Sequence, residues 1–341
     1  MTAVHPHAHG GPVARGRMRV EPADFRVEEV LGFEPDGSGE HAFLWIEKTG
    51  ANTDWVARRL AQAAGVAPMA VGYAGLKDRH AVTRQAFTLQ LAGRAEPDWG
   101  ALGIEGVEVL SVARHSRKLR RGAHRGNRFV IRLRDVEGDP DAIGDRLALI
   151  REHGVPNYFG EQRFGRDGGN LALAEALFAG RRLPREQHGI ALSAARSALF
   201  NALLARRVDE VTWNQPVDGE VWMLDGTHAI FGPEPWSDTL AQRLAAQDIH
   251  PTGPMWGRGP LRSEGTAGEL ERAVAQVHAS LASGLERAGL SQERRALRLR
   301  VHDLRHAWLD HGLLELGFSL GSGAFATAVL QELLDWHADT G

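Results

Sequence analysis

Strand-like alternation at both ends of this chain flanks a middle whose pattern is mostly helical. Apolar and polar residues alternate at 25–29, 129–133 and 314–320, with the period of two that half-buried strands require. From about residue 155 to about residue 300 the apolar residues instead recur at helical spacing. This order predicts an α+β protein in which one sheet is built from both chain ends and a mostly helical block is inserted between them.

The length of 341 residues suits two domains of ordinary size. We place the sheet-based domain at residues 1–153 and 300–341, and the inserted domain at 154–299. Further strands are expected at 42–48, 70–74 and 87–91, and further helices at 52–65, 171–178, 191–208, 240–247, 269–288 and from 326 up to 336.

Composition excludes several classes of protein. No run of 18 apolar residues exists, so no membrane span is expected, and the first residues lack the apolar stretch of a secretory signal. The absence of cysteine excludes disulfides, thiolate zinc sites and cysteine nucleophiles, and it agrees with a cytoplasmic protein. No HExxH motif occurs, so no metal is expected. Residues 1–16 carry His5, His7 and His9 and favour a disordered tail over a metal site.

A polar turn at 75–80 follows the short strand predicted at 70–74, and it places Asp78 between Lys77 and Arg79. Neighbouring cations favour the ionised carboxylate, which could act as a nucleophile or a base. The pattern also fits a turn aspartate that bonds its own backbone or caps a helix. Only three of the 40 basic residues are lysines, at positions 48, 77 and 118. Because Lys and Arg differ in shape, some sites do not accept both.

Residues 114–128 carry seven Arg or Lys residues and no acid, in a chain of net charge −3. A phosphate backbone is the natural partner of such a segment, whereas a merely solvated face usually mixes both signs. Asn127 and Phe129 supply an amide and an aromatic plane, which are the groups that hold a splayed base. The residues expected to contact RNA are Arg114, Arg117, Lys118, Arg120, Arg121 and Arg125.

Two further segments each allow two interpretations. Residues 157–165 hold three aromatics among polar groups and two glycines, at the predicted domain junction. They form either part of a ligand cleft or a packed hinge. Phe325 follows the Gly-Ser-Gly at 321–323 and either stands at the rim of a site or begins a core helix.

Together these motifs resemble the TruD family of tRNA pseudouridine synthases. The segment at 75–85, Gly-Leu-Lys-Asp-Arg-His-Ala-Val-Thr-Arg-Gln, is similar to the signature of that family. Further similar blocks follow in family order, and only about 205–297 matches loosely. These blocks lie at 24–29, 114–127, 155–165, 192–201 and 323–327.

The resemblance implies a pseudouridine synthase catalytic domain with a central mixed or antiparallel sheet, split in sequence by an inserted, mostly helical TruD-specific domain. It implies that Asp78 is the catalytic aspartate and that Phe25, Asn127 and Phe325 contact the target nucleoside. It also implies that no cofactor or metal is needed, and that the usual substrate is the uridine at position 13 of tRNA.

Two more residues are expected to bind substrate. Lys77 directly precedes the aspartate, and Phe129 stands where other pseudouridine synthase families place a tyrosine, so no phenolic base is available there. Arg19 occupies a place where family members often carry lysine, and a cation is therefore retained.

The expected function is isomerisation of uridine to pseudouridine in tRNA, by a cytoplasmic protein that is a monomer by default. The target base is flipped out of the RNA. Asp78 then starts N-glycosidic cleavage by attacking C1′ or C6, or by removing the proton at C2′, and the freed base rotates so that C5 joins C1′. Two alternatives remain: a non-catalytic RNA-binding or RNA-chaperone protein, and a protein without a nucleic-acid partner whose basic loop is incidental.

Overall fold

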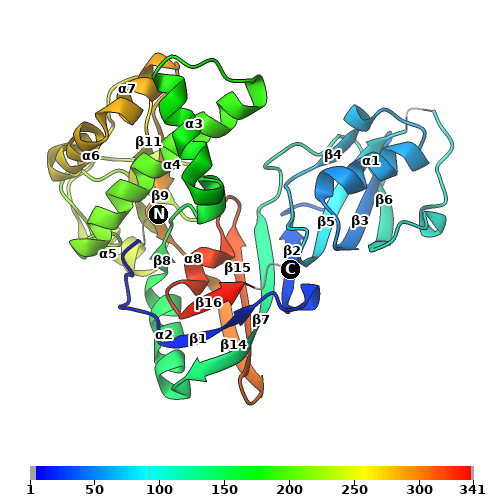
Figure 1. Ribbon diagram of the computed structural model, residues 1–341, viewed down its shortest axis with the longest axis horizontal. Helices are drawn as coiled ribbons and strands as arrows, with labels where there is room; N and C mark the ends of the chain where they lie inside the picture. Colours follow the sequence, from blue (N-terminus) through cyan, green and yellow to red (C-terminus); the bar gives the residue numbers. More distant parts are fainter. Residues whose placement is uncertain (1–4, 92, 339–341) are drawn as a thin grey trace. The chain divides into compact units, whose positions relative to one another are not determined.

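The computed structural model describes residues 5–91 and 93–338, and the chain divides into two compact units. The sheet unit combines Val13–Ile143, His302–Gly323 and the residues from Leu334 onward. The central unit combines the residues up to Pro12 with Gly144–Val301 and Ala324–Leu333. Figure 1 shows that blue and red strands, from opposite ends of the chain, lie together in the sheet unit.

Among the described residues of the sheet unit, ten strands form one mixed sheet. The main order is β14-β15-β7-β2-β5-β3-β6, with β1 joining β7 to β16 and β4 beside β5. The pairs β2–β5 and β1–β16 are parallel, and the other pairs are antiparallel. The strands are β1 (Ala14–Met18), β2 (Phe25–Val30), β3 (His41–Thr49), β4 (Val71–Tyr73), β5 (Val82–Gln90), β6 (Val107–His115), β7 (Gly126–Gly138), β14 (His302–Asp310), β15 (Leu313–Gly321) and β16 (Leu334–Ala338).

The helix predicted at 52–65 is confirmed as α1 (Thr53–Ala63), which covers part of this sheet. Its apolar residues recur at helical spacing, and Val56 and Leu60 are fully buried against Leu44 and Phe87 of the strands. Burial of each such side chain contributes about 1.5–3 kcal/mol, so packing holds the helix on the sheet. The connections include the short 3-10 helices η1 (Pro22–Asp24), η2 (Pro68–Ala70) and η3 (Trp99–Ala101).

The central unit is richer in helices, as its sequence pattern predicts. A four-stranded sheet of order β10-β9-β11-β12 and the pair β13–β8 accompany the helices, and α2 (Pro140–His153) begins in the sheet unit and ends in the central unit. The prediction of an α+β protein with a large mixed sheet is confirmed. The elements are α3 (Gly169–Phe178), α4 (Arg185–Asp209), α5 (Asp238–Ala245), α6 (Gly265–Val277), α7 (Ala279–Arg287), α8 (Ala326–Leu330), η4 (Glu161–Arg163), η5 (Arg166–Gly168), β8 (Val155–Pro156), β9 (Trp222–Leu224), β10 (Ile230–Phe231), β11 (Ile249–Met255), β12 (Glu293–Ala296) and β13 (Arg298–Leu299).

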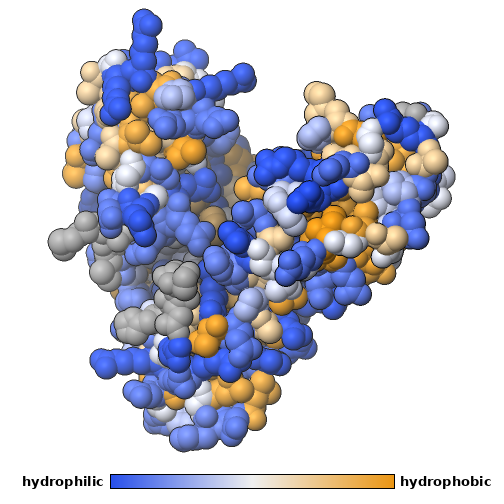
Figure 2. Space-filling view, turned by 45° about the vertical axis from the view of Figure 1, so that its right-hand side comes forward, coloured by the Kyte–Doolittle hydropathy of each residue, from blue (hydrophilic) through white to orange (hydrophobic). Residues whose placement is uncertain are grey.

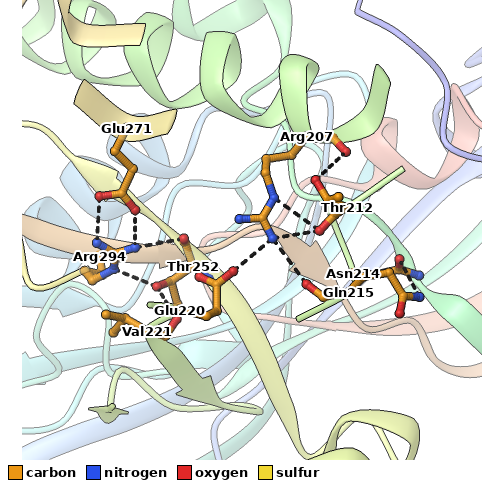
Figure 3. A network of polar contacts seen from close by, with 9 residues as sticks. All are labelled: Arg207, Thr212, Asn214, Gln215, Glu220, Val221, Thr252, Glu271 and Arg294. Carbon is orange, nitrogen blue, oxygen red and sulfur yellow. Dashed lines mark hydrogen bonds and ion pairs between the residues drawn. The ribbon is translucent and has the colours of Figure 1, made fainter. Parts of the chain in front are cut away.

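A buried polar network links the elements of the central unit (Figure 3). Arg207 of α4 donates to Glu220 at 2.9 Å, and Arg294 of β12 donates to Glu271 of α6 at 2.6 Å. Thr252 of β11 lies between the pairs, because its N–H donates to Glu220 and its hydroxyl accepts from Arg294. Burial raises the pKa of Glu220. Removing one carboxylate or guanidinium from the network leaves a buried charge without its counter-charge, so the network favours this packing of the elements it joins.

Two predicted helices are wrong in extent. The helix expected at 269–288 is broken at His278, whose φ of −108° and ψ of 39° end α6 and begin α7. The helix expected up to Trp336 ends at Leu330, because Leu334–Ala338 instead pairs in parallel with β1. The apolar spacing from 326 to 334 fits a helix, but pairing with a strand from the other end of the chain overrides it.

The prediction of a disordered tail at 1–16 is wrong for the residues that the structure describes, and residues 1–4 lie outside them. The His5 ring stacks on Tyr158 at a centroid distance of 4.4 Å. The N–H groups of Ala8 and His9 donate to the Glu332 carboxylate at 3.1 and 3.2 Å. This docked segment, residues 5–12, therefore packs on the central unit, and β1 begins two residues later.

Docking of residues 5–12 should weaken as the solution is acidified. Burial lowers the pKa of His5, His7 and His9 below the ordinary 6.5, so the released segment binds protons more readily than the docked segment. The contribution of these histidines is complete above about pH 6.5 and is lost as the pH falls below it. Burial raises the pKa of Glu332. The contribution of this carboxyl group to docking therefore increases as the pH falls, opposite to that of the histidines.

Amide hydrogen exchange of residues 8–11, corrected for intrinsic rates, should show less protection at about pH 5.5 than at about pH 7.5. A variant with His5, His7 and His9 replaced by Gln keeps only the contribution of Glu332. If the variant and the wild-type chain show the same pH dependence, the histidines do not control docking.

Candidate active site

The residues singled out at 75–80 form part of the connection between β4 and β5, which are antiparallel neighbours in the sheet. We call residues 74–81 the Asp78 turn. The Asp78 side chain is 28% exposed. Its Oδ1 accepts a hydrogen bond from the N–H of His80 at 3.0 Å, and its Oδ2 lies 2.9 Å from Nη2 of Arg19. One oxygen therefore stabilises the turn, as the backbone-bonding interpretation expected, and the other is held by a cation.

Arg19 is held in an unusual conformation next to this carboxylate. Its φ of 63° lies in the left-handed region, which residues other than glycine rarely adopt. Its guanidinium carbon lies 4.3 Å from the centroid of the Phe25 ring, a cation–π contact. The ring contact and the ion pair together fix the guanidinium beside Asp78.

Two buried ammonium groups, those of Lys48 and Lys77, hold the Asp78 turn in place. Lys48 is fully buried, and its Nζ donates to the carbonyl oxygens of Ala51 at 2.8 Å and of Asp78 at 2.9 Å. Burial lowers the pKa of Lys48 to about 8, so the side chain is charged at pH 7. The Nζ of Lys77 lies 2.7 Å from Oε1 of the buried Glu29. Two of the three lysines of the chain thus anchor this turn, where a compact ammonium suits the space better than a guanidinium fork.

Two buried polar side chains fix the backbone at the start of the turn. Thr53 accepts from the N–H of Lys77 at 3.0 Å and donates to Gln85 Oε1 at 3.0 Å. Gln85 in turn donates from Nε2 to the carbonyl oxygen of Gly75 at 3.1 Å. Sequence reasoning missed these two residues, because Thr53 starts an ordinary helix and Gln85 lies in an ordinary strand.

Four side chains of the site lie on one face of the sheet: Phe25 and Glu29 of β2, and Asn127 and Phe129 of β7. Glu29 of β2 is directly opposite Asn127 of β7, and residues two apart on a strand share a face, which brings Phe25 and Phe129 to the same side. The two aromatic rings meet edge to face at 6.2 Å, and both are buried. The Asn127 Oδ1 is buried and has no hydrogen-bond partner in the described part of the chain. Because buried acceptors are normally satisfied, this atom is a candidate for binding a ligand N–H.

His124 is a further neighbour of the turn. A Cβ placed on Gly75 would lie 3.3 Å from the His124 Cε1 atom and 3.3 Å from Lys77 Nζ. The absence of a side chain at position 75 therefore leaves space for both His124 and Lys77. Burial and the nearby charge of Lys77 lower the pKa of His124, which keeps the imidazole neutral at pH 7. Sequence reasoning counted His124 only as part of the basic segment.

The basic segment is partly neutralised by acids from other strands and loops. Arg114 lies 2.8 Å from Glu96, and Arg121 lies 3.5 Å from Asp54. Such partners are distant in sequence, so a reading of 114–128 alone could not reveal them. Four of the residues predicted to bind RNA are exposed and have no acidic partner among the residues that the structure describes. No carboxylate of residues 5–91 and 93–338 lies within 4.0 Å of Arg117, Lys118, Arg120 or Arg125.

The segment at 157–165 is mostly packed inside the central unit. Tyr158 and Phe159 are 2% and 5% exposed and belong to a core cluster with Phe200. Phe325, directly before α8, is partly buried and packs against the same cluster. Within its own unit, Phe325 therefore has the core contacts that its second interpretation expected.

The described residues contain no group of three His, Asp or Glu side chains that could hold a metal ion. Among the same residues, no helix is both long and apolar enough to cross a membrane.

Three kinds of comparison relate this chain to known proteins. A family model described as tRNA pseudouridine synthase D (TruD) matches residues 4–181 and 172–333. A tRNA pseudouridine synthase D of Xanthomonas campestris is 53% identical over 347 residues, which cover 97% of this chain and 95% of the relative. One of Methylococcus capsulatus is 54% identical over 333 residues, covering 97% and 94%. A crystal structure from Methanosarcina mazei has the same fold, with a TM-score of 0.72 at 20% identity over 96% of this chain and 95% of that one.

The large mixed sheet is the fold that the resemblance led us to expect. The chain belongs to the TruD family of tRNA pseudouridine synthases.

The variant Glu29→Gln should lower the free energy of unfolding of the sheet unit by about 3–5 kcal/mol, because it leaves the buried Lys77 ammonium without its counter-charge. The double variant Glu29→Gln/Lys77→Met should recover part of this loss. Urea denaturation followed by circular dichroism measures both. Glu28→Gln is the matched control, because its exposed pair with Arg128 is worth at most about 1 kcal/mol. Equal losses in Glu29→Gln and Glu28→Gln would contradict the anchoring role.

Proposed function

We propose that this chain isomerises uridine to pseudouridine in tRNA, at position 13, and that Asp78 is the catalytic carboxylate. The proposal rests chiefly on the geometry of Asp78: a partly exposed carboxylate whose Oδ2 lies 2.9 Å from Arg19, in a turn anchored by buried side chains. Membership of the TruD family supports it. An anchored, partly exposed acid suits a reaction in which one group must meet an extruded nucleoside without further rearrangement.

The reaction begins when the target uridine leaves its stack, which costs a few kcal/mol. The Asp78 carboxylate then starts cleavage of the bond between N1 and C1′, by attack on C1′ or C6 or by removal of the C2′ proton. The free base rotates, C5 bonds to C1′, and the proton on C5 is lost while N1 gains one. Substrate and product are isomers, so the proposed reaction consumes nothing and needs no cofactor.

Arg19 has a positioning role in this scheme. Its guanidinium pairs with Asp78 at 2.9 Å and fixes the direction of Oδ2. Its contact with the Phe25 ring ties this orientation to the sheet.

We assign the substrate contacts as follows. Asn127 binds a polar edge of the nucleoside through its unsatisfied Oδ1. Phe25 and Phe129 form the aromatic side of the site, and Lys77 borders it while its ammonium is held by Glu29. Phe325 remains a contact predicted from the family resemblance.

We further infer that residues 1–153 and 300–341 act as the catalytic domain and residues 154–299 as the inserted TruD domain. The two compact units support this division except at 1–12, 144–153, 300–301 and 324–333, which belong to the central unit. The exposed cations of the basic segment bind the tRNA backbone, with Arg114 and Arg121 contributing where their acids leave them accessible. A tRNA substrate places the enzyme in the cytoplasm, where we expect it to act as a monomer.

Asp78→Asn should abolish pseudouridine formation while leaving the affinity for tRNA within about threefold of wild type, because the amide retains the size of the side chain but not its basicity. Pseudouridine mapping of a tRNA transcript and a binding assay measure the two quantities. Asp141→Asn, at an exposed position of α2, is the control. Wild-type turnover in Asp78→Asn would show that Asp78 is not the catalytic carboxylate, whereas a wild-type chain that binds tRNA without forming pseudouridine would favour the RNA-binding or RNA-chaperone alternative.

Replacement of Arg117, Arg120 and Arg125 by Gln should weaken tRNA binding and reduce the slope of log Kd against log salt by about 2–3, because each neutralised phosphate contributes about 0.7–0.9 to the slope. The control replaces Arg132, Arg206 and Arg243, which are paired with Glu315, Glu210 and Asp248. Both triple variants lose the same charge, so identical slopes would show that the basic segment is not the binding surface.

A further inference from the structure

Leu76 is a large apolar side chain that is 61% exposed within the Asp78 turn. Isolated apolar residues are common on protein surfaces, and Figure 2 shows several on one face of the molecule. Exposure alone therefore assigns no role. The feature that assigns a role to Leu76 is the fixed backbone on both sides of it.

The backbone on both sides of Leu76 is fixed by buried groups. The carbonyl oxygen of Gly75 accepts from Gln85 at 3.1 Å, and the N–H of Lys77 donates to Thr53 at 3.0 Å. Gln85 is fully buried and Thr53 is 1% exposed. Leu76 thus projects into solvent from a rigid base, whereas an exposed side chain on a loosely held loop would have no fixed direction.

Leu76 is also close to the proposed reacting group. Two residues span at most about 7 Å, so Leu76 lies within that distance of Asp78 along the backbone. Stacked nucleotides are about 3.4 Å apart. A nucleotide bound at Asp78 therefore has its neighbours in the RNA within reach of the Leu76 side chain.

We propose that Leu76 packs against the nucleotide next to the target and fills the gap left when the uridine is extruded. This inference rests on the proposed function. Extrusion exposes the apolar faces of the neighbouring bases, and proteins that unstack nucleic acids insert Leu, Phe, Ile or Met at such steps. A wedge on a fixed backbone favours the extruded state, because little of its own freedom is lost on binding.

The test compares Leu76→Ala with the conservative variant Leu76→Met. Met69→Ala is the matched control, because Met69 is 81% exposed and lies in the short helix η2 of the same unit. Leu76→Ala should slow single-turnover pseudouridine formation about tenfold or more and change the Kd for tRNA less than threefold. Leu76→Met should restore most of the rate, and Met69→Ala should not reduce it.

A second measurement separates extrusion from chemistry. In an Asp78→Asn background, a tRNA carrying 2-aminopurine beside the target reports unstacking by fluorescence. Leu76→Ala should reduce the fluorescence change on binding, and Leu76→Met should retain it. An unchanged signal and rate in Leu76→Ala, or equal losses in Leu76→Ala and Met69→Ala, would overturn the wedge. If the wild-type chain forms no pseudouridine, the proposed function fails instead, and the fluorescence still tests the contact.

Discussion

Burial of two ammonium groups beneath one turn is the constraint on which the site depends. Lys48 donates to the backbone of Ala51 and Asp78, and Lys77 pairs with Glu29, all within the large sheet unit. A buried charge is tolerated only when it is paired or hydrogen-bonded, so each lysine forces the surrounding chain into one arrangement. That arrangement presents Asp78 with little freedom. The Asp78 carboxylate remains partly exposed while the side chains that hold its turn are buried.

The sheet supplies the rest of the geometry. Strands β2 and β7 come from different parts of the chain, yet their register places Glu29 opposite Asn127. Strand β5 continues directly from the Asp78 turn and contributes Gln85 to its support. Asp78 itself lies in a turn, but side chains of β2, β3 and β5 hold that turn to the same sheet that carries Asn127. Precise placement of this kind is what a reaction on an extruded nucleoside requires.

Local patterns predicted most strands of the sheet, the helix α1 and the position of the Asp78 turn, because period and turn chemistry are properties of neighbouring residues. Local patterns gave wrong predictions where partners distant in the sequence determine the structure. Leu334–Ala338 is a strand because β1 lies beside it, and residues 5–12 are held by partners distant in sequence, including Tyr158 and Glu332. Thr53 and Gln85 could not be recognised as supports of the site, since their roles depend on contacts across 24 and 10 positions. The scarcity of lysine was the one sequence signal that pointed to the buried anchors.

A structure of the Asp78→Asn variant bound to a tRNA substrate would test the central claim most directly. The measured quantity is the distance from the side chain of residue 78 to the ribose C1′ of the extruded uridine. The account predicts that the uridine is out of its stack and that this distance is at most about 4 Å, close to the separation of reacting groups. A uridine still stacked in the RNA, or a ribose bound far from residue 78, would contradict it.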